Sequence, residues 1–132
     1  MESNKISEEE CIFCNRENLK NKVLFETTNW IAIYDGFPVS NGHTLLIPKG
    51  HYRTIFDLPL ELWDSLPYRI FDVKRIIDAK YHPSGYNIGV NVNESAGQSV
   101  MHCHIHIIPR YDGDVENPRG GVRGVIPSRM NY

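Results

Sequence analysis

The sequence predicts a single α+β domain built on an antiparallel sheet of about five strands and one long helix. Two observations support this fold class. Short apolar or alternating runs recur along the chain between turn-forming residues, and helical periodicity is confined to one region that begins at Asp57. The length of 132 residues fits one domain with a core of its own.

The first half of the chain supplies a tail, a hairpin and a strand. Residues 1–10 are polar and acidic and indicate a flexible N-terminal tail, so we expect the ordered domain to span residues 11–132. Residues 23–35 contain two apolar runs around a Thr-Thr-Asn turn and predict a hairpin. Residues 43–50 predict a nearly continuous apolar strand that Pro48 stops.

The long helix is predicted from apolar residues at three- and four-residue spacing. These residues are Leu58, Leu62, Leu66, Ile70, Val73 and Ile77. Asp57 is expected as the N-cap, and Pro59 falls in the first turn, where a missing N–H is harmless. Pro67 lies in the middle of the pattern, so we expect it to kink the helix or to break it into two pieces.

The second half continues with two strands and a long C-terminal segment. Residues 86–93 alternate as a strand, and residues 99–110 predict the last and longest strand. Residues 111–132 are rich in glycine, proline and arginine. We expect them to form an extended segment laid on the surface of the same domain.

Composition narrows the class of partner. The net charge of −2 offers no electrostatic footprint for nucleic acid. The N-terminus has no apolar signal region and no apolar run approaches the length that spans a membrane, so we expect a cytoplasmic protein. In that compartment Cys11, Cys14 and Cys103 are expected to be reduced, which favours metal binding or burial over disulfides.

Three of the six histidines occupy alternate positions in the stretch HCHIHIIPR. Because a strand sends successive side chains to opposite faces, His102, His104 and His106 are expected to share one face of the last strand. Such a row suits either a zinc or iron site or nucleophilic catalysis. A metal site of the cupin kind usually adds a carboxylate downstream, whereas a proline and an arginine follow here, and this favours catalysis.

The residues that precede the histidines point to phosphate. The stretch ESAGQS, residues 94–99, is a turn of small residues that can aim backbone N–H groups, the Gln98 amide and the Ser99 hydroxyl at an anion. Joined directly to a row of imidazoles, this turn indicates a phosphate held against a nucleophilic nitrogen.

These motifs resemble the histidine triad (HIT) superfamily. HCHIHII matches its His-φ-His-φ-His-φ-φ pattern, in which φ is apolar, and CIFC, IAIYDGFPVSNGHTLLIPKGH and NVNESAGQS resemble its supporting segments in order and spacing. The resemblance covers residues 11–110. It implies a HIT-like fold, paired as a homodimer, that binds a nucleotide substrate and attacks its α-phosphate through a covalent nucleotidyl-histidine intermediate.

The resemblance also implies roles for individual residues. His104 would be the nucleophile, His106 would contact the phosphate or the leaving group, and His43 would support the cluster. The groups implied to hold the ribose and the phosphate are Asp35, Asn93, Gln98 and Ser99. Apolar residues that could wall a base pocket are Ile12, Phe13, Ile33 and Phe37.

Cys11 and Cys14 form a C-x-x-C pair, the spacing that clips one zinc ion from a tight turn. From the residues alone, two small buried cysteines are an equal alternative, and two thiolates do not complete a tetrahedral site. The resemblance to bacterial HIT proteins that carry this pair implies that His51 and His102 complete a closed, structural zinc site.

Three functional interpretations remain open at this point. Basic residues near the site would suit phosphates beyond the attacked one, so we expect dinucleoside polyphosphates as the preferred substrates. These residues are Lys49, Arg110, Arg119 and Arg123. The alternatives are a nucleoside phosphoramidase of the AMP-amide type and a nucleotide-sensing module with little turnover. The intact triad argues against the sensing module, because pure binding needs no nucleophile.

Overall fold

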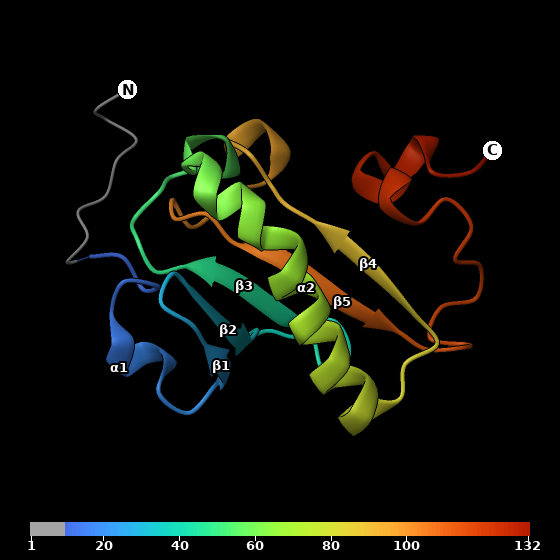
Figure 1. Cartoon of the computed structure of the whole chain (residues 1–132). Helices are drawn as coiled ribbons and strands as arrows, with labels where there is room; N and C mark the ends of the chain where they lie inside the picture. Colours follow the sequence, from blue (N-terminus) through green and yellow to red (C-terminus); the bar gives the residue numbers. More distant parts are fainter. Residues whose placement is uncertain (1–9) are drawn as a thin grey trace.

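The computed structural model describes residues 10–132, so residues 1–9 of the expected N-terminal tail lie outside the described part. As predicted, the fold is α+β with a five-stranded antiparallel sheet, and the strand order is β1-β2-β3-β5-β4 (Figure 1). The strands are β1 (Val23–Glu26), β2 (Trp30–Tyr34), β3 (Thr44–Pro48), β4 (Gly85–Gly89) and β5 (Ile105–Arg110). The predicted hairpin forms from β1 and β2, and β3 ends at the predicted proline.

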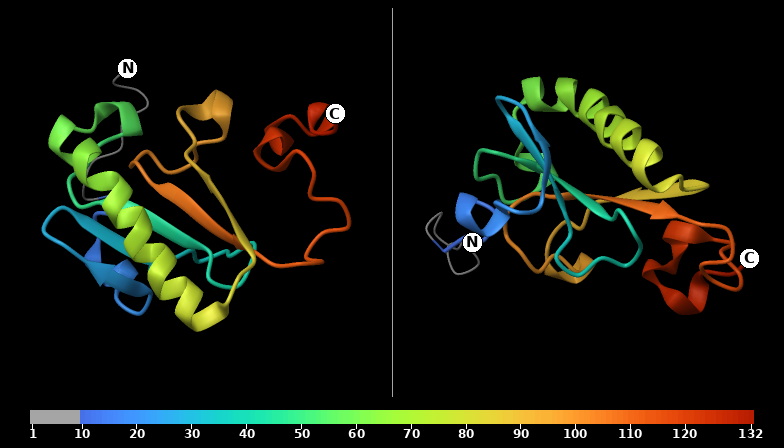
Figure 2. Two further views of the ribbon diagram at one scale, coloured as in Figure 1. Left: turned by 45° about the vertical axis from the view of Figure 1, so that its right-hand side comes forward. Right: turned by 90° about the horizontal axis from the view of Figure 1, so that it is seen from below.

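The central strands β2 and β3 are buried on both faces of the sheet, and each face carries a different part of the molecule. The long helix α2 (Leu60–Tyr81) covers one face, and α1 (Arg16–Leu19) lies on the other side (Figure 2). Ala32 and Leu46 pack in a cluster with the apolar face of α2. Their strand neighbours Ile33 and Leu45 point the opposite way, into a smaller cluster that Leu19 of α1 completes. This smaller cluster forms the floor under the candidate site.

The long helix differs from the prediction at its start and at its proline. It begins at Leu60 with Pro59 as N-cap, because Asp57 is used elsewhere: its carboxylate accepts from the Thr54 N–H in a capping box that closes a 3₁₀ turn. The helix runs unbroken through Pro67, so the expected break is wrong. Pro67 lies on the exposed side of α2, where water can satisfy the carbonyl that a proline leaves without its N–H partner.

The last two strands are both shorter than predicted. The chain leaves the sheet after Gly89, and β5 begins only at Ile105, which pairs with Leu46. The N–H of Cys103 donates to the carbonyl of Tyr52 at 2.6 Å instead of joining a ladder. The expected strand of residues 99–110 is therefore wrong in its first half, and His102 does not share a strand face with His106.

The C-terminal segment also differs from its prediction. Residues 111–132 are not extended throughout: two 3₁₀ helices form at Gly121–Val125 and Pro127–Arg129. These turns lie beside β4, on the side of the sheet away from α2 (Figures 1 and 2). Within residues 10–132, no helix has the length and apolar character that crossing a membrane requires.

Candidate functional site

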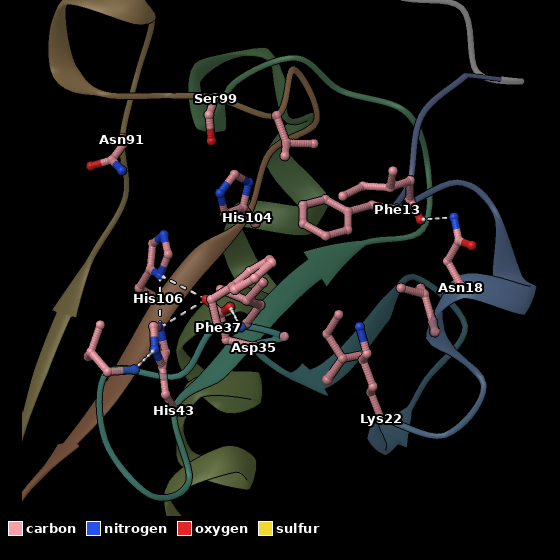
Figure 3. Close-up of a pocket in the computed structure, with 17 residues that line it drawn as sticks. Phe13, Asn18, Lys22, Asp35, Phe37, His43, Asn91, Ser99, His104 and His106 are labelled. Atoms are coloured by element: carbon pink, nitrogen blue, oxygen red, sulfur yellow. Dashed lines mark hydrogen bonds and ion pairs between the residues drawn. The ribbon is translucent and has the colours of Figure 1, made fainter.

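A pocket of about 470 Å³ opens on the sheet face opposite α2 (Figure 3). One part of its wall is apolar and comes from the CIFC loop, α1, the smaller core cluster and the loop that follows β2. These residues include Ile12, Phe13, Leu19, Ile33, Phe37 and Leu45. The other part carries the polar groups that chemistry would need, namely Asp35, His43, Asn91, Ser99, His104 and His106.

The tautomer of His104 follows from its surroundings. Its Nδ1 lies 2.8 Å from the backbone oxygen of His102, and because a carbonyl oxygen can only accept, Nδ1 must carry the proton. Neutral His104 then has its lone pair on Nε2. The ring is 8 % exposed and rests edge-on against Phe13, with 5.2 Å between the ring centroids. His104 thus presents an oriented, basic nitrogen from the wall of the pocket.

A second chain of hydrogen bonds orients His43 and His106. The backbone N–H of Val39 donates to Nδ1 of His43 at 3.1 Å, so neutral His43 carries its proton on Nε2. That N–H donates to Nδ1 of His106 at 3.0 Å, which leaves the proton of neutral His106 on Nε2. Figure 3 shows this second nitrogen of His106 pointing away from His43. His106 therefore offers a hydrogen-bond donor beside the lone pair of His104, and the two ring centroids are 5.2 Å apart.

Burial keeps these supporting imidazoles neutral. Burial lowers the pKa of His43, with the nearby Asp35 carboxylate opposing the shift. Burial, together with the neighbouring His104 and His43 rings, lowers the pKa of His106 to about 4 against the same opposition from Asp35. A histidine with a lowered pKa in the folded state is protonated more readily in the unfolded chain. The folded state therefore loses stability as the pH falls from about 6.5 towards 4.

Asp35, His43 and His106 bring three potential ligand atoms within 4.8 Å of one another. A metal held by Nε2 of His43 would require the proton of that neutral ring to move to Nδ1. There it would face the N–H of Val39, which is itself a donor. The chemistry of this cluster therefore suits a hydrogen-bond relay better than a metal, and this agrees with the preference for catalysis over the metal interpretation of the histidine row.

A different set of four side chains forms a cage suited to zinc. Nδ1 of His102 lies 3.3 Å from Sγ of Cys11, 3.4 Å from Sγ of Cys14 and 3.1 Å from Nδ1 of His51. All four potential ligand atoms lie within 4.8 Å of one another. In a tetrahedral site with bonds of about 2.0–2.3 Å, ligand atoms stand roughly 3.3–3.8 Å apart, so these separations fit closely.

The outer nitrogen of His102 supports the same interpretation. Its Nε2 lies 2.9 Å from the carbonyl oxygen of Pro48, so Nε2 carries the proton and Nδ1 faces the cage with a lone pair. His102 and Cys11 are fully buried. Cys14 and His51 are partly buried, and the four side chains together supply all the donors of a tetrahedral site, as expected for a structural site rather than a catalytic one.

The site geometry agrees with comparison to known proteins. Residues 16–113 match the family model described as the HIT domain. The chain belongs to the HIT family. An uncharacterized HIT-like protein of Methanocaldococcus jannaschii is 42% identical over 110 residues, which cover 80% of this chain and 83% of that protein.

Two relatives carry named activities. An adenosine 5′-monophosphoramidase of Saccharomyces cerevisiae is 36% identical over 105 residues, covering 77% of this HIT chain and 63% of the relative. An adenylylsulfatase of Arabidopsis thaliana is 34% identical over 107 residues, covering 80% of this chain and 54% of the relative. A zinc-bound histidine triad family protein from Mycobacterium smegmatis superposes with a TM-score of 0.73 at 30% identity, covering 84% of this chain and 82% of that one.

Not every residue implied by the HIT resemblance faces the pocket. Ser99 lines the pocket, whereas Gln98 is 3 % exposed and its side-chain amide bonds to backbone groups of the surrounding loops. The side chain of Gln98 accepts from the N–H of Asn93 at 2.8 Å and donates to the carbonyls of Arg53 and Val100. Asn93 accepts from the Arg53 guanidinium at 3.0 Å. In this structure Gln98 and Asn93 hold the phosphate-side loop in shape, and their contact with a nucleotide stays a prediction.

Sequence reasoning missed three polar residues of the pocket, namely Asn18, Lys22 and Asn91. Asn91 lines it where the chain leaves β4, and Lys22 reaches it from the segment before β1 (Figure 3). Asn93 was named through the resemblance, and Asn91 alternates with it in the predicted strand of residues 86–93, so the pattern held a signal for Asn91. Lys22 lies in a short polar stretch without periodicity, and nothing in the sequence marks it.

Proposed function

We propose that this HIT protein is a nucleotidyl hydrolase or transferase that attacks the α-phosphate of a nucleoside monophosphate derivative through a covalent nucleotidyl-His104 intermediate. One observation carries the proposal: the bond from Nδ1 of His104 to the His102 carbonyl leaves Nε2 unprotonated within the pocket. A binding module would need neither that tautomer nor a second histidine that presents a donor beside it.

The reaction would proceed in two displacements at phosphorus. In the first, Nε2 of His104 forms a bond to phosphorus while the bond to the leaving group breaks and the leaving atom takes the electron pair; an amine leaving group also takes a proton, which Nε2–H of His106 would donate. In the second, water attacks phosphorus, breaks the bond to Nε2, and restores His104. The N–H that His106 offers supports stabilisation of the charge that develops on the phosphoryl and leaving-group atoms.

The rest of the pocket supports binding of a nucleoside. The apolar wall that includes Phe13 and Ile33 provides a surface for a base, and Asp35 directly follows β2 beside it. One carboxylate oxygen of Asp35 accepts from the N–H of Phe37 at 2.8 Å, which fixes the side chain. Its other oxygen lies 3.4 Å from Nε2 of His43, and together these contacts support Asp35 as the group that accepts the ribose hydroxyls.

We also propose that Cys11, Cys14, His51 and His102 hold a structural zinc ion. When bound, the zinc ion would only cross-link the three chain segments that carry these residues. Its position matters to the chemistry because the backbone oxygen of His102 fixes the tautomer of His104, and the CIFC loop carries Phe13, whose ring contacts both histidines.

A homodimer is the proposed assembly. Large apolar side chains lie exposed on and just before the outer side of α2, namely Phe56, Leu60, Trp63, Tyr68 and Phe71. β4 lies at one end of the sheet order, so one of its edges has no partner strand. Since exposed apolar side chains and an open strand edge each favour association, a symmetric pair that buries both would stabilise the fold.

The expected role of the basic residues receives no support from the geometry. Lys49 pairs with Glu26 and Arg110 pairs with Asp114. The guanidinium groups of Arg119 and Arg123 lie over the ring of Tyr132 at 4.8 and 4.6 Å from its centroid. Dinucleoside polyphosphates therefore remain one substrate class to test beside AMP amides and adenylyl sulfate.

The proposed function is tested by incubating purified protein with an AMP amide, diadenosine tetraphosphate and adenylyl sulfate and measuring AMP release. At least one substrate should turn over, and His104→Ala should lose several orders of magnitude in rate while it still binds AMP. His106→Ala should lose less. Near-normal turnover by His104→Ala would contradict the proposal, as would the absence of AMP from every substrate.

A further inference from the structure

The phosphate-side loop, residues 93–98, lies between two polar groups of the candidate pocket. Asn91 precedes the loop and Ser99 follows it, and both side chains line the pocket (Figure 3). The two ends of the loop are bonded to each other. The N–H of Asn93 donates to the side-chain oxygen of Gln98 at 2.8 Å, and the N–H of Gln98 donates to the backbone oxygen of Asn93 at 3.1 Å. This bonded pair, the neck of the loop, therefore sets how far apart Asn91 and Ser99 lie.

One residue of the neck has a strained backbone. Asn93 has a φ of 71° and a ψ of 166°. Glycine is almost the only residue that adopts this conformation, because a Cβ crowds the backbone there. The other non-glycine residue with a positive φ within residues 10–132 is His82, whose φ of 54° and ψ of 51° are those of an ordinary left-handed helix cap. Asn93 therefore needs a specific interaction to keep its conformation.

Arg53 supplies that interaction and contacts both residues of the neck. Its Nη1 donates to Oδ1 of Asn93 at 3.0 Å, and its backbone oxygen accepts from the side-chain amide of Gln98 at 2.7 Å. Nε of Arg53 is buried and has no partner within residues 10–132. Because a buried donor without a partner is unfavourable, the guanidinium is held in place against a penalty and is not simply a solvated surface charge. Two unfavourable features thus meet at one point beside the candidate pocket.

We propose that Arg53 is a positioning residue for the phosphate: its guanidinium holds Asn93 in the strained conformation, and the neck thereby fixes the spacing of Asn91 and Ser99. This inference rests on the proposed function. Arg53 does not line the pocket, so it acts through the loop and not on the substrate. Without the guanidinium, Asn93 would relax to a more favourable φ and Ser99 would move relative to the phosphorus. A small misplacement of groups that orient the reacting centre slows the chemical step strongly.

The experiment measures Arg53→Met, which keeps an aliphatic stem and removes the donors, alone and combined with Asn93→Gly. Glycine adopts the conformation of residue 93 without strain, so the neck should then no longer need Arg53. The substrate is whichever of the AMP amide, diadenosine tetraphosphate and adenylyl sulfate turns over fastest. Arg53→Met should lower kcat roughly tenfold or more and change KM less. In the Asn93→Gly background the same change should alter kcat by less than about twofold.

The comparison within each background removes any direct contact of Asn93 with the nucleotide, since such a contact is lost equally from both members of the pair. Arg53→Ala should behave as Arg53→Met does, which shows that the result does not depend on how one replacement packs. Arg53→Lys keeps a donor and the positive charge, so it should retain more of the wild-type kcat than either. Thermal unfolding checks that each variant is folded at the assay temperature.

Arg75→Met is the matched control, because Arg75 is an exposed arginine of α2 that pairs with Asp72 on the other face of the sheet. It should leave kcat and KM unchanged. An unchanged kcat in folded Arg53→Met, or an equal loss of kcat in both backgrounds, would overturn the positioning role while leaving the His104 mechanism intact. AMP release by wild-type protein from none of the three substrates would instead overturn the proposed function.

Discussion

Loss of the metal cage should destabilise the fold and, at the same time, disturb the orientation of the nucleophile His104. The variant that tests this is Cys14→Ser, because Cys14 is only partly buried and its replacement leaves no core cavity, whereas Cys11 is fully buried. Cys14 lies 3.2 Å from Nδ1 of His51 and 3.4 Å from Nδ1 of His102, so the change removes one of four converging donors. A neutral serine hydroxyl is a much weaker zinc ligand than a thiolate.

The size of the effect follows from the length of chain that the cage closes. Cys11 and His102 are 91 residues apart in sequence. A covalent cross-link that closes a loop of this length is worth about 4–5 kcal/mol in the chain-entropy model, and we take this as the part of the metal's contribution that comes from constraining the chain. For a domain of this size each kcal/mol moves Tm by roughly 3–4 °C, so a loss of this size should lower Tm by about 12–20 °C.

The assay combines zinc analysis, thermal unfolding and steady-state kinetics. Wild-type protein purified without a tag should contain about one zinc ion per chain, and a strong chelator should lower its Tm to that of Cys14→Ser. The chelator should not lower Cys14→Ser further. Because the His102 carbonyl fixes the His104 tautomer, kcat should fall more than KM rises.

Cys103→Ala provides the matched control, because Cys103 is a buried cysteine of the core that is absent from the cage. Its starting Tm should fall through lost packing, but the chelator should lower it by as much as it lowers the wild type. Wild-type protein that holds no zinc and has the same Tm with and without chelator would refute the reasoning.

Three further predictions concern titration, assembly and ribose recognition. The lowered pKa of His106 should keep its ring neutral in ¹⁵N NMR spectra down to about pH 5, and a titration midpoint near pH 6.5 would contradict this. A shift of this pKa from 6.5 to about 4 corresponds to a loss in folding stability of at most about 3 kcal/mol as the pH falls through that window. Phe71→Asp, at a 65% exposed position on α2, should convert a sedimenting dimer to monomer, and a wild-type monomer at micromolar concentration would end the dimer proposal. Asp35→Asn should raise KM for adenosine substrates roughly tenfold or more but should barely affect 2′,3′-dideoxy analogues, and an equal effect on both would exclude a ribose contact.

Local signals were enough to predict most of the fold. The hairpin follows from its turn residues, and the end of β3 follows from the missing N–H of Pro48. Both signals act on residues only a few positions away in sequence. The helix start was placed too early because the Asp57 carboxylate does take part in capping, but as the capping-box partner of Thr54 at the start of the 3₁₀ turn. A cap signal alone does not say which of two consecutive helical segments it closes.

Contacts between distant segments account for what the sequence could not predict. His102 contacts cysteines about 90 residues away in sequence and lies outside β5, which begins at Ile105. The strict alternation of the histidines therefore does not indicate a continuous strand. The relay from the Val39 N–H through His43 to His106 depends on a loop conformation that no pattern encodes. The stacking of Arg119 and Arg123 on the ring of Tyr132 likewise arises only once the C-terminal segment folds back.

The central claim is that Nε2 of His104 forms a covalent bond to phosphorus, and rapid-quench trapping tests it most directly. Wild-type protein is mixed with an AMP amide labelled at phosphorus, quenched in alkali within milliseconds, digested and mapped by mass spectrometry. The account predicts a nucleotidyl group on the peptide that contains His104, attached to that residue and absent from His104→Ala. Label on any other residue, or release of both products at equal rates with no labelled protein at the earliest times, would contradict it.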